Sequence, residues 1–397
     1  MSLSPVSYAC TLTLSTGCQA LAASSQIRSY AAELALANTA TKAGPGGRSS
    51  VSGMTATVFG GNGFVGSYVT NELAKNGSQV VVPYRSVETE VMHLKQMGDL
   101  GQVVLLGSFD LRSDEAIRYA ISRSNVVVNL VGMRKESMNW SFEEVHVDFP
   151  ARLARIAAES GHVERLIHFS DIAADEGHAS ERLSSKARGD KLVMQHFPQA
   201  TILRPGPVVG IEDHFFNYMI YQLSFNVFAM VIDGGKALVQ PTYVLDVAAA
   251  VTRCLQTKES AGQTYYLGGP EVLSMRQLYD VIIKTLRLHT DDTIHVPAWF
   301  AKLMWRNKSW WRRRLPSLPV ASYMASVDYV EEVTRDRVAP EGSLGYVDLE
   351  IKAVKVTDGL AIEPVRHYRV GGYRWGDMQT VAENVPEHIK KYYNIKT

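Results

Sequence analysis

The most constraining feature of this chain is a set of three glycines, at 60, 63 and 66, that directly follows a short apolar segment. That segment, Thr55–Phe59, is rich in β-branched side chains and too short for a helix, which predicts a buried strand. From Phe64 to Ala74 the apolar residues recur at helical spacing. The sequence therefore predicts a strand, a tight glycine turn and a helix in direct succession.

A glycine turn between a strand and a helix is suited to binding a pyrophosphate. Its glycines permit a tight turn, a close approach of the backbone to the phosphates, and close packing of the helix on the sheet. Free N–H groups and the helix dipole favour an anion at the start of the helix. We therefore predict dinucleotide binding here, with contacts from Gly60, Asn62, Gly63, Phe64 and Val65.

The residues after the second predicted strand, Gln79–Pro83, decide which dinucleotide fits. An NAD site usually has Asp or Glu there to hold the ribose hydroxyls, whereas an Arg can pair with the extra phosphate of NADP. This chain has Arg85 at that place, and the first carboxylate after the predicted strand is that of Glu88. Because a guanidinium binds phosphate in a bidentate manner, the sequence favours NADP(H), with Arg85 as the phosphate contact. A solvated arginine at the start of a loop is the alternative.

The third predicted strand, Gln102–Leu106, is followed by a polar loop that contains Asp110 and Leu111. Both residues are placed to cap an adenine. Asp110 is equally suited to be the N-cap of the helix expected from Ser113 onward. The two roles are compatible.

The next predicted strand, Asn125–Gly132, is apolar almost throughout, as a central parallel strand should be. We expect the residues at its end to lie along the cofactor, namely Leu130, Val131 and Gly132. An amphipathic helix is expected over Trp140–Ser160 and another strand over Arg165–Ser170. The alternation of strands and helices from residue 55 to 204 predicts an α/β fold with a parallel, doubly wound sheet.

Together these motifs resemble the extended short-chain dehydrogenase/reductase superfamily. The motifs are Gly60-x-x-Gly63-x-x-Gly66, Asp110, Asn129-Leu-Val-Gly132, Ser170, Lys186 and Arg204-Pro205-Gly206. The resemblance implies a Rossmann-type sheet and a smaller C-terminal α/β region, followed here by an extended C-terminal tail. It also implies cofactor contacts from Ser170, Lys186 and Pro205.

Longer runs resemble one family of this superfamily, the nucleotide-binding accessory subunits of mitochondrial complex I. These runs are Arg48–Gly53, Ala56–Gly60, Gly77–Val80, Pro83–Arg85, Met92–Leu94, Met97–Gln102 and Gln240–Val247. The resemblance implies an NADPH-binding subunit, peripheral on the matrix side of the inner membrane and in contact with other complex I subunits. We expect it to serve assembly or stability of the complex.

An active member of the superfamily uses a Tyr as general acid/base and a Lys four residues later. Lys186 fills the second position, but Arg182 stands at the first. A guanidinium stays protonated at any accessible pH, so Arg182 cannot exchange the proton that hydride transfer needs. We therefore expect no catalytic residue and take Lys186 as a ribose and phosphate contact. A Tyr from elsewhere would restore the alternative, an active NADP-dependent reductase or epimerase.

Composition argues against a nucleic-acid partner, a disulfide framework and a metal site. A net charge of +1 over 397 residues gives no general excess of Lys and Arg, so no nucleic-acid partner is expected. The only cysteines are Cys10, Cys18 and Cys254, which excludes a disulfide framework. The histidines lack the spacing of a metal site, so we expect no metal. His168, inside a predicted strand, is expected to be a packed residue.

We expect five segments along the chain. The first fifty residues contain one acidic residue, Glu33, which is typical of an organelle transit peptide. A disordered tail or a chloroplast address fits the same composition. We place a mitochondrial transit peptide at 1–30, a linker at 31–53, the dinucleotide-binding domain at 54–210, a smaller substrate-side or docking region at 211–319, and a C-terminal extension at 320–397.

Two stretches in the second half of the chain bear on contact with a membrane or with partner subunits. Phe215–Ile232 is predicted to be a buried or interface helix, because its polar residues argue against a membrane span. Val296–Arg314 has four Trp among six basic residues and no acid. This composition suits a membrane surface or a subunit interface; RNA stacking and a solvated helix remain alternatives. We expect the tail from Val320 to lie on a partner.

Overall fold

The computed structural model describes residues 52–225, 229–286, 288, 293–306 and 326–357, and the single positions 362, 365 and 368. The expected transit peptide and nearly all of the expected linker lie outside these described residues. So do the second half of the Trp- and Arg-rich stretch and most of the chain after residue 357.

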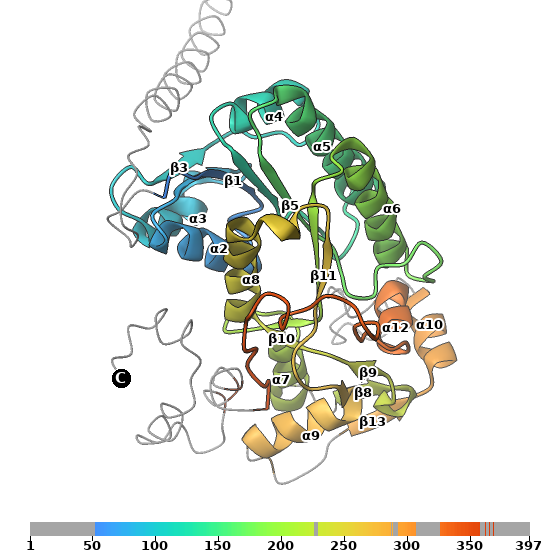
Figure 1. Cartoon of the computed structure of the whole chain (residues 1–397). Helices are drawn as coiled ribbons and strands as arrows, with labels where there is room; N and C mark the ends of the chain where they lie inside the picture. The colour runs from blue at the N-terminus through green and yellow to red at the C-terminus, as the bar shows by residue number, and fades with distance from the viewer. Residues whose placement is uncertain are drawn as a thin grey trace, which may run out of the picture.

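A seven-stranded sheet forms the centre of the molecule, in the order β11-β6-β5-β4-β1-β2-β3 (Figure 1). Every pairing in it is parallel. The chain begins in the middle, winds to one edge and then to the other, so the predicted doubly wound α/β fold is confirmed. Its strands are β1 (Thr55–Phe59), β2 (Gln79–Pro83), β3 (Val103–Leu106), β4 (Val126–Asn129), β5 (Arg165–Phe169), β6 (Thr201–Pro205) and β11 (Thr264–Leu267).

Helices cover both faces of this sheet, which is why its strands read as continuous apolar runs. One face carries α2 (Phe64–Lys75), α3 (Glu88–Val91), the 3-10 helix η1 (Met92–Met97) and α8 (Val244–Gln256). The other carries α4 (Asp114–Ile121), the π-helical turn η2 (Glu143–Asp148), α5 (Phe149–Ser160) and α6 (Glu181–His196). The long helix expected over Trp140–Ser160 is thus two segments, and it begins after Trp140.

Of two expected helix boundaries, the end of α5 is as predicted and the N-cap of α4 is a different residue. Helix α5 ends at Gly161, whose φ of 69° lies in the left-handed region that glycine adopts without strain. Helix α4, by contrast, is capped by Ser113, whose hydroxyl accepts a hydrogen bond from the Ala116 N–H at 3.2 Å. The suggestion that Asp110 is this N-cap was wrong. Its carboxylate accepts from the Arg112 N–H in the preceding loop.

A smaller region lies at the carboxyl end of the sheet and has its own apolar core (Figure 1). Three strand pairs build it: β7 (Val208–Val209) with β10 (Thr242–Tyr243), β9 (Leu238–Val239) with β12 (Leu273–Ser274), and β8 (Ala229–Ile232) with β13 (Thr293–Val296). Its helices are α7 (Phe216–Phe225), α9 (Met275–Leu286) and α10 (Ala298–Arg306), with the short 3-10 turn η3 (Asp233–Gly235). The other short 3-10 turn, η4 (Lys258–Ser260), follows α8 and precedes β11 of the large sheet.

The single helix expected over Phe215–Ile232 was wrong in its second half. Helix α7 ends at Phe225, and Ala229–Ile232 forms β8 instead. Its side chains alternate between buried and half-buried positions, as a strand paired along one edge requires. Within the described ranges, no helix has both the length and the apolar character to cross a membrane.

The described part of the C-terminal extension packs on this chain. Helix α12 (Val327–Val333) lies against α10. Beyond it, Tyr346, Leu349 and Ile351 join the core under α2 and α8, while Val354 and Val356 join the core of the smaller region. The expectation that the tail lies on a partner is therefore wrong for residues 326–357, because their apolar side chains complete this chain's own cores.

Candidate functional site

The glycine turn between β1 and α2 has the geometry of a phosphate cradle. Gly60 has a φ of 79°, and a Cβ there would lie 3.0 Å from the carbonyl carbon of Leu130. A Cβ on Gly66 would collide with the Gly60 carbonyl oxygen. Both positions therefore require glycine for the fold itself.

Gly63 differs from its two neighbours because it is exposed and has an ordinary backbone conformation, with φ −77°. It is the N-cap of α2, whose start has no capping side chain and no acidic residue in the first turn. An added Cβ would meet only the Gly60 carbonyl oxygen, at 3.2 Å. The first N–H groups of this helix are thus left without a capping side chain, and that a side chain at residue 63 would obstruct a phosphate there stays a prediction.

The ends of neighbouring strands bring the expected cofactor residues to one edge of the sheet. Leu130 donates its N–H to the Phe59 carbonyl at 2.9 Å, which holds the end of β4 against the glycine turn. The Val131 N–H donates to the Asn129 side-chain oxygen at 3.1 Å. The backbone of Leu130 and Val131 is therefore beside Gly60, and a cofactor contact from Leu130, Val131 and Gly132 stays a prediction.

Sequence reasoning missed His146 as the residue that fixes the next turn of this loop. Its Nε2 accepts from the Met133 N–H at 3.0 Å, and its Nδ1 lies 3.0 Å from the Ser185 hydroxyl. Burial lowers the pKa of His146 to about 2, and the nearby charges of Lys186 and Arg182 act in the same direction. His146 therefore stays neutral and links the loop after β4 to helix α6.

Three side chains lie close together where the sequence predicts the adenosine. Arg85, just after β2, is exposed and its guanidinium carbon lies 5.3 Å from the centroid of the Trp140 ring. The guanidinium of Arg112 lies 4.1 Å from the same centroid. Asp110 is exposed and Leu111 is buried on the loop that precedes Arg112. Sequence reasoning selected Arg85, Asp110 and Leu111 but gave no role to Arg112 and treated Trp140 only as a helix start.

At the other end of the site, Lys186 and Ser170 are neighbours. The Lys186 ammonium donates to the Ser170 carbonyl at 3.0 Å. Burial, with Arg182 beside it, lowers the pKa of Lys186 to about 8. The Ser170 hydroxyl is buried and has no hydrogen-bond partner among the described residues. Pro205 lies at the end of β6, where its carbonyl accepts from the Ile172 N–H.

These features fit a bound dinucleotide. The uncapped helix start is suited to a phosphate, and the orphaned Ser170 hydroxyl and two further N–H bonds of Lys186 are suited to ribose hydroxyls. No group of His, Cys, Asp or Glu among the described residues is arranged to hold a metal ion. The roles assigned to individual cofactor contacts stay predictions.

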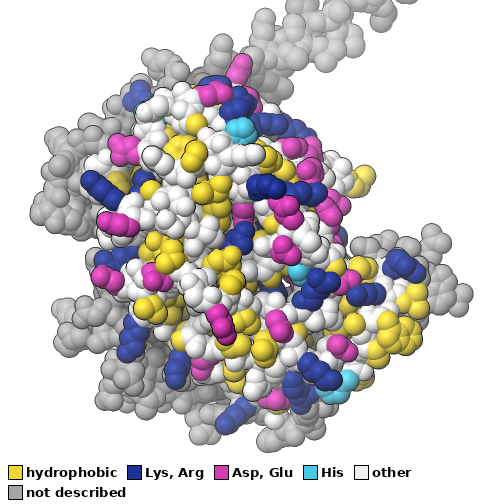
Figure 2. Space-filling model, turned by 45° about the vertical axis from the view of Figure 1, so that its right-hand side comes forward, with side chains coloured by type: hydrophobic (Ala, Val, Ile, Leu, Met, Phe, Trp, Pro, Cys, Tyr) yellow, Lys and Arg dark blue, Asp and Glu magenta, His cyan; other side chains and the backbone are white. Residues whose placement is uncertain are grey.

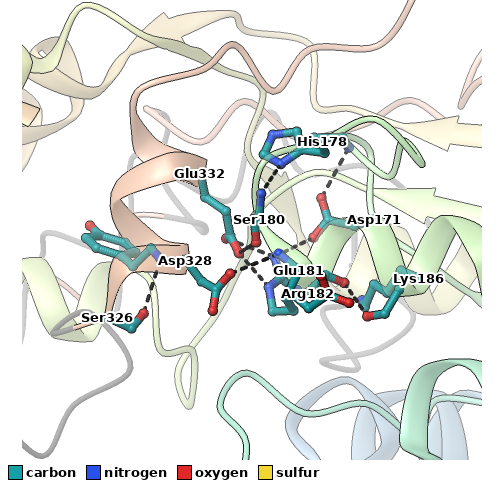
Figure 3. Close-up of polar contacts among 12 residues, drawn as sticks. Asp171, His178, Ser180, Glu181, Arg182, Lys186, Ser326, Asp328 and Glu332 are labelled. Atoms are coloured by element: carbon teal, nitrogen blue, oxygen red, sulfur yellow. Dashed lines mark hydrogen bonds and ion pairs between the residues drawn. The ribbon is translucent and has the colours of Figure 1, made fainter. Parts of the chain in front are cut away.

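Arg182, at the position of the missing Tyr, is the centre of a buried ion cluster (Figure 3). Its Nε and Nη2 donate to the two carboxylate oxygens of Glu332 at 2.7 and 2.9 Å. Its Nη2 also donates to Asp171 at 3.2 Å. Arg337 donates to both oxygens of Asp171 at 3.2 and 3.1 Å. Glu332 and Arg337 belong to the C-terminal segment, about 150 residues along the chain.

The cluster is internally neutralised. Burial raises the pKa of Asp171, but the charges of Arg337 and Arg182 outweigh it and hold that pKa below its usual range. The same opposition, with Arg182 as the main partner, lowers the pKa of Glu332. The Ser180 hydroxyl donates to Glu332 at 3.2 Å as well. All members are therefore charged and paired, and none exchanges a proton near neutral pH.

A second buried polar group, also missed from sequence, lies under the sheet edge. The Asn129 amide lies 3.1 Å from His168 Nδ1, and His168 Nε2 lies 3.4 Å from Asp190. Arg204 donates to Asp190 at 2.8 Å. The prediction that His168 is a packed residue is confirmed, since only 4% of it is exposed.

A comparison with known proteins identifies the class. The profile of the NAD dependent epimerase/dehydratase family matches residues 56–268. A dTDP-glucose 4,6-dehydratase from Bacillus anthracis in complex with NAD is similar in fold, with TM-score 0.53 and 17% identity, over 62% of this chain and 84% of that one. MoeE5 in complex with UDP-glucuronic acid and NAD gives TM-score 0.51 and 19% identity, over 61% and 85%. The chain belongs to the NAD dependent epimerase/dehydratase family.

Curated relatives place it within that class. The chain is 37% identical over 344 residues to NADH dehydrogenase (ubiquinone) 1 alpha subcomplex subunit 9, mitochondrial, of Arabidopsis thaliana, covering 86% of this chain and 84% of the relative. The Mus musculus subunit of the same name is 36% identical over 356 residues, covering 88% and 89%. The mitochondrial NADH-ubiquinone oxidoreductase 40 kDa subunit of Neurospora crassa is 32% identical, covering 88% and 88%. The chain belongs to this family of mitochondrial complex I subunits, which confirms the resemblance.

Proposed function

We propose that the chain is an NADP(H)-binding accessory subunit of mitochondrial complex I that supports assembly or stability of the complex and does not turn the nucleotide over. The observation that carries the proposal is the contrast at Arg182. The glycine turn is intact, while the position of the proton donor is occupied by a buried, fully paired guanidinium.

Two properties of the ion cluster support the absence of turnover. Arg182 has no accessible neutral form, so it cannot act as a general acid or base. The Glu332 side chain lies directly against Arg182, only 2% of this residue is exposed, and its helix α12 covers that side of the site. A substrate carbonyl placed there would have to displace a buried carboxylate from its partner.

The preference for NADP(H) is supported by Arg85. It follows β2, it is exposed, and no carboxylate among the described residues lies within ion-pair distance of it. The intact chain should bind NADPH more tightly than NADH by calorimetry. Arg85→Ala should weaken NADPH binding by about 1.5–3 kcal/mol, the range for hydrogen bonds to charged groups, and leave NADH nearly unchanged. Arg118→Ala, at a surface pair with Glu159, is the matched control.

The partner side of the proposal rests on helix α10. Trp299 is 68% exposed, and Phe300 and Leu303 are also exposed on this helix, while Trp305 is buried against α12. At the right of Figure 2, the side that carries α10 and α12, hydrophobic side chains gather beside Lys and Arg. Exposed aromatic residues with neighbouring cations suit docking on membrane-arm subunits or the anionic membrane surface. We place the chain peripherally on the matrix side of the inner membrane.

Native isolation from mitochondria tests the assignment. The chain should co-migrate with complex I, and the nucleotide extracted from the purified subunit should be NADP(H). Migration as a free protein would contradict the subunit proposal. Oxidation of NADPH by the purified chain with a panel of small carbonyl compounds, lost in Lys186→Ala, would instead establish an active reductase.

A further inference from the structure

We propose that Trp140 is a preformed platform that positions Arg85 for the 2′-phosphate of the nucleotide, and that Arg112 holds this platform in place. The inference rests on the proposed NADP(H) site and extends it to two residues that the sequence did not single out. Three loops, after β2, β3 and β4, meet at this point.

The backbone around Trp140 is held by reciprocal hydrogen bonds. The Trp140 N–H donates to the Ser137 hydroxyl at 3.1 Å, and the Ser137 N–H donates to the Trp140 carbonyl at 3.0 Å. The next residue, Ser141, caps the following helix. Its hydroxyl accepts from the Glu144 N–H at 3.2 Å, and the Glu144 carboxylate accepts from the Ser141 N–H at 3.1 Å. This capping box fixes the direction in which the chain leaves Trp140.

Arg112 links the Trp140 ring to the Ser141–Glu144 capping box. Its Nε and Nη2 donate to the second carboxylate oxygen of Glu144 at 3.1 and 2.8 Å, and its Nη2 donates to the Asn139 carbonyl at 2.7 Å. Hydrogen bonds from Ser141 and Arg112 lower the pKa of Glu144, which therefore remains a carboxylate partner. The guanidinium plane of Arg112 is thereby fixed against the Trp140 ring, 4.1 Å from its centroid.

Arg85 contrasts with Arg112 in its partners. Both guanidinium groups lie against one ring, so they are closer together than the Debye length, which is about 10 Å at 0.1 M salt. The charge of Arg112 is offset by Glu144. Arg85 has the ring as its contact, and the described residues place no carboxylate in ion-pair range of it. Arg85 is therefore the guanidinium of this pair that has no carboxylate in ion-pair range among the described residues.

A doubly charged phosphate ester is the ligand that such an arrangement favours. The ring restricts the long Arg85 side chain before the ligand arrives, so less conformational entropy is lost on binding. The guanidinium keeps its bidentate edge for phosphate oxygens while its face rests on the indole. The chemical class is thus a nucleotide phosphorylated at the 2′-hydroxyl of adenosine, recognised without help from its nicotinamide end.

Calorimetry with two small probes tests this on the intact chain. Adenosine 2′,5′-bisphosphate and adenosine 5′-monophosphate differ only in the 2′-phosphate. The Kd of the monophosphate divided by the Kd of the bisphosphate is therefore a ratio that reports recognition of the 2′-phosphate. Trp140→Ala should reduce this ratio about 2- to 5-fold, the range for a cation–π contact, and Trp140→Phe should restore most of it. Arg112→Leu should reduce the ratio in the same direction, and Trp299→Ala, on α10, should leave it unchanged.

Three results would overturn the inference. Unchanged Kd values of both probes in Trp140→Ala, with a wild-type ratio well above one, would remove the platform and leave the NADP(H) preference standing. An equal loss for both probes would mean that Trp140 serves the fold or stacks on adenine only. A wild-type ratio near one would refute the NADP(H) preference itself and the platform with it. Circular dichroism of each variant separates these outcomes from unfolding.

Discussion

The two ends of the candidate site treat their charged groups in opposite ways. At the glycine turn and at Arg85, backbone N–H groups and a guanidinium lie exposed at the edge of the sheet. At Arg182 the charges are paired within the chain, and Arg182, Asp171 and Glu332 are buried. An exposed, uncompensated positive region is adapted to an external anion, whereas a neutralised, buried cluster is adapted to holding the chain together. Under the proposed function, the first of these two ends binds the nucleotide and the second is a structural contact.

The largest expected effect tests the structural role of the buried cluster at Arg182. Glu332→Ala should lower the free energy of unfolding by about 3–5 kcal/mol, because it leaves Arg182 buried without its bidentate partner. The neighbouring Glu331 pairs with the partly exposed Lys302, so Glu331→Ala should cost only about 0–1 kcal/mol. Urea unfolding of both variants measures the difference. Similar small losses for the two would show that the cluster contributes little to stability.

The next effect concerns the binding half. A ligand that binds only the folded chain stabilises it by about 2.7 kcal/mol at a hundredfold excess over Kd. Gly63→Val should remove this stabilisation by NADPH, because the site at the helix start is obstructed, while the unliganded chain should change little. We expect less assembled complex I, with normal electron transfer per assembled complex. Full assembly with an empty site would argue against a stabilising role, and slow electron transfer in assembled complexes would indicate a redox role.

The smallest effect concerns the pH dependence of the free energy of unfolding, to which the buried His146 contributes. Folded His146 stays neutral with a pKa of about 2, but in the unfolded chain its pKa is about 6.5. The unfolded state therefore takes up a proton first as pH falls, so His146 lowers stability by about 1.4 kcal/mol between pH 7.5 and 5.5. His146→Gln should flatten that part of the stability profile relative to the wild type. Asp213, whose burial raises its pKa to about 6, acts in the opposite direction in both proteins, so only the difference between the profiles is diagnostic.

Local pattern was sufficient to predict the sheet and the phosphate turn. Strand β1, Gly60 and helix α2 are contiguous, and their apolar spacing changes where the structure changes. The error at Ala229–Ile232 has a tertiary cause, since that short apolar run is equally compatible with a helix and becomes a strand only through pairing with β13. Helix and strand cannot be separated by periodicity in so short a run.

The ion cluster could not be predicted in the same way. The sequence predicts that Arg182 replaces a proton donor, and this stays a prediction; an unexpected buried Arg also signals that an acid must lie nearby. That acid, Glu332, is 150 residues distant in sequence, and nothing local distinguishes it from Glu331. Likewise Trp140 follows β4 and Arg112 follows β3, and β1 and β2 lie between these strands in the sheet, so the contact of the two side chains arises only from the tertiary fold.

The separation between Arg182 and Glu332 also has a consequence in time. A ribosome adds about 5–20 residues per second, so the 150 residues between these partners take roughly 8–30 s to synthesise. Throughout that interval Arg182 exists without its main counter-charge, and the cores that await Tyr346 and Val354 are incomplete. The N-terminal sheet therefore cannot complete its cores until these last residues are available. A chain that stops before Glu332 would keep every predicted cofactor contact and still lack the carboxylate that pairs with Arg182.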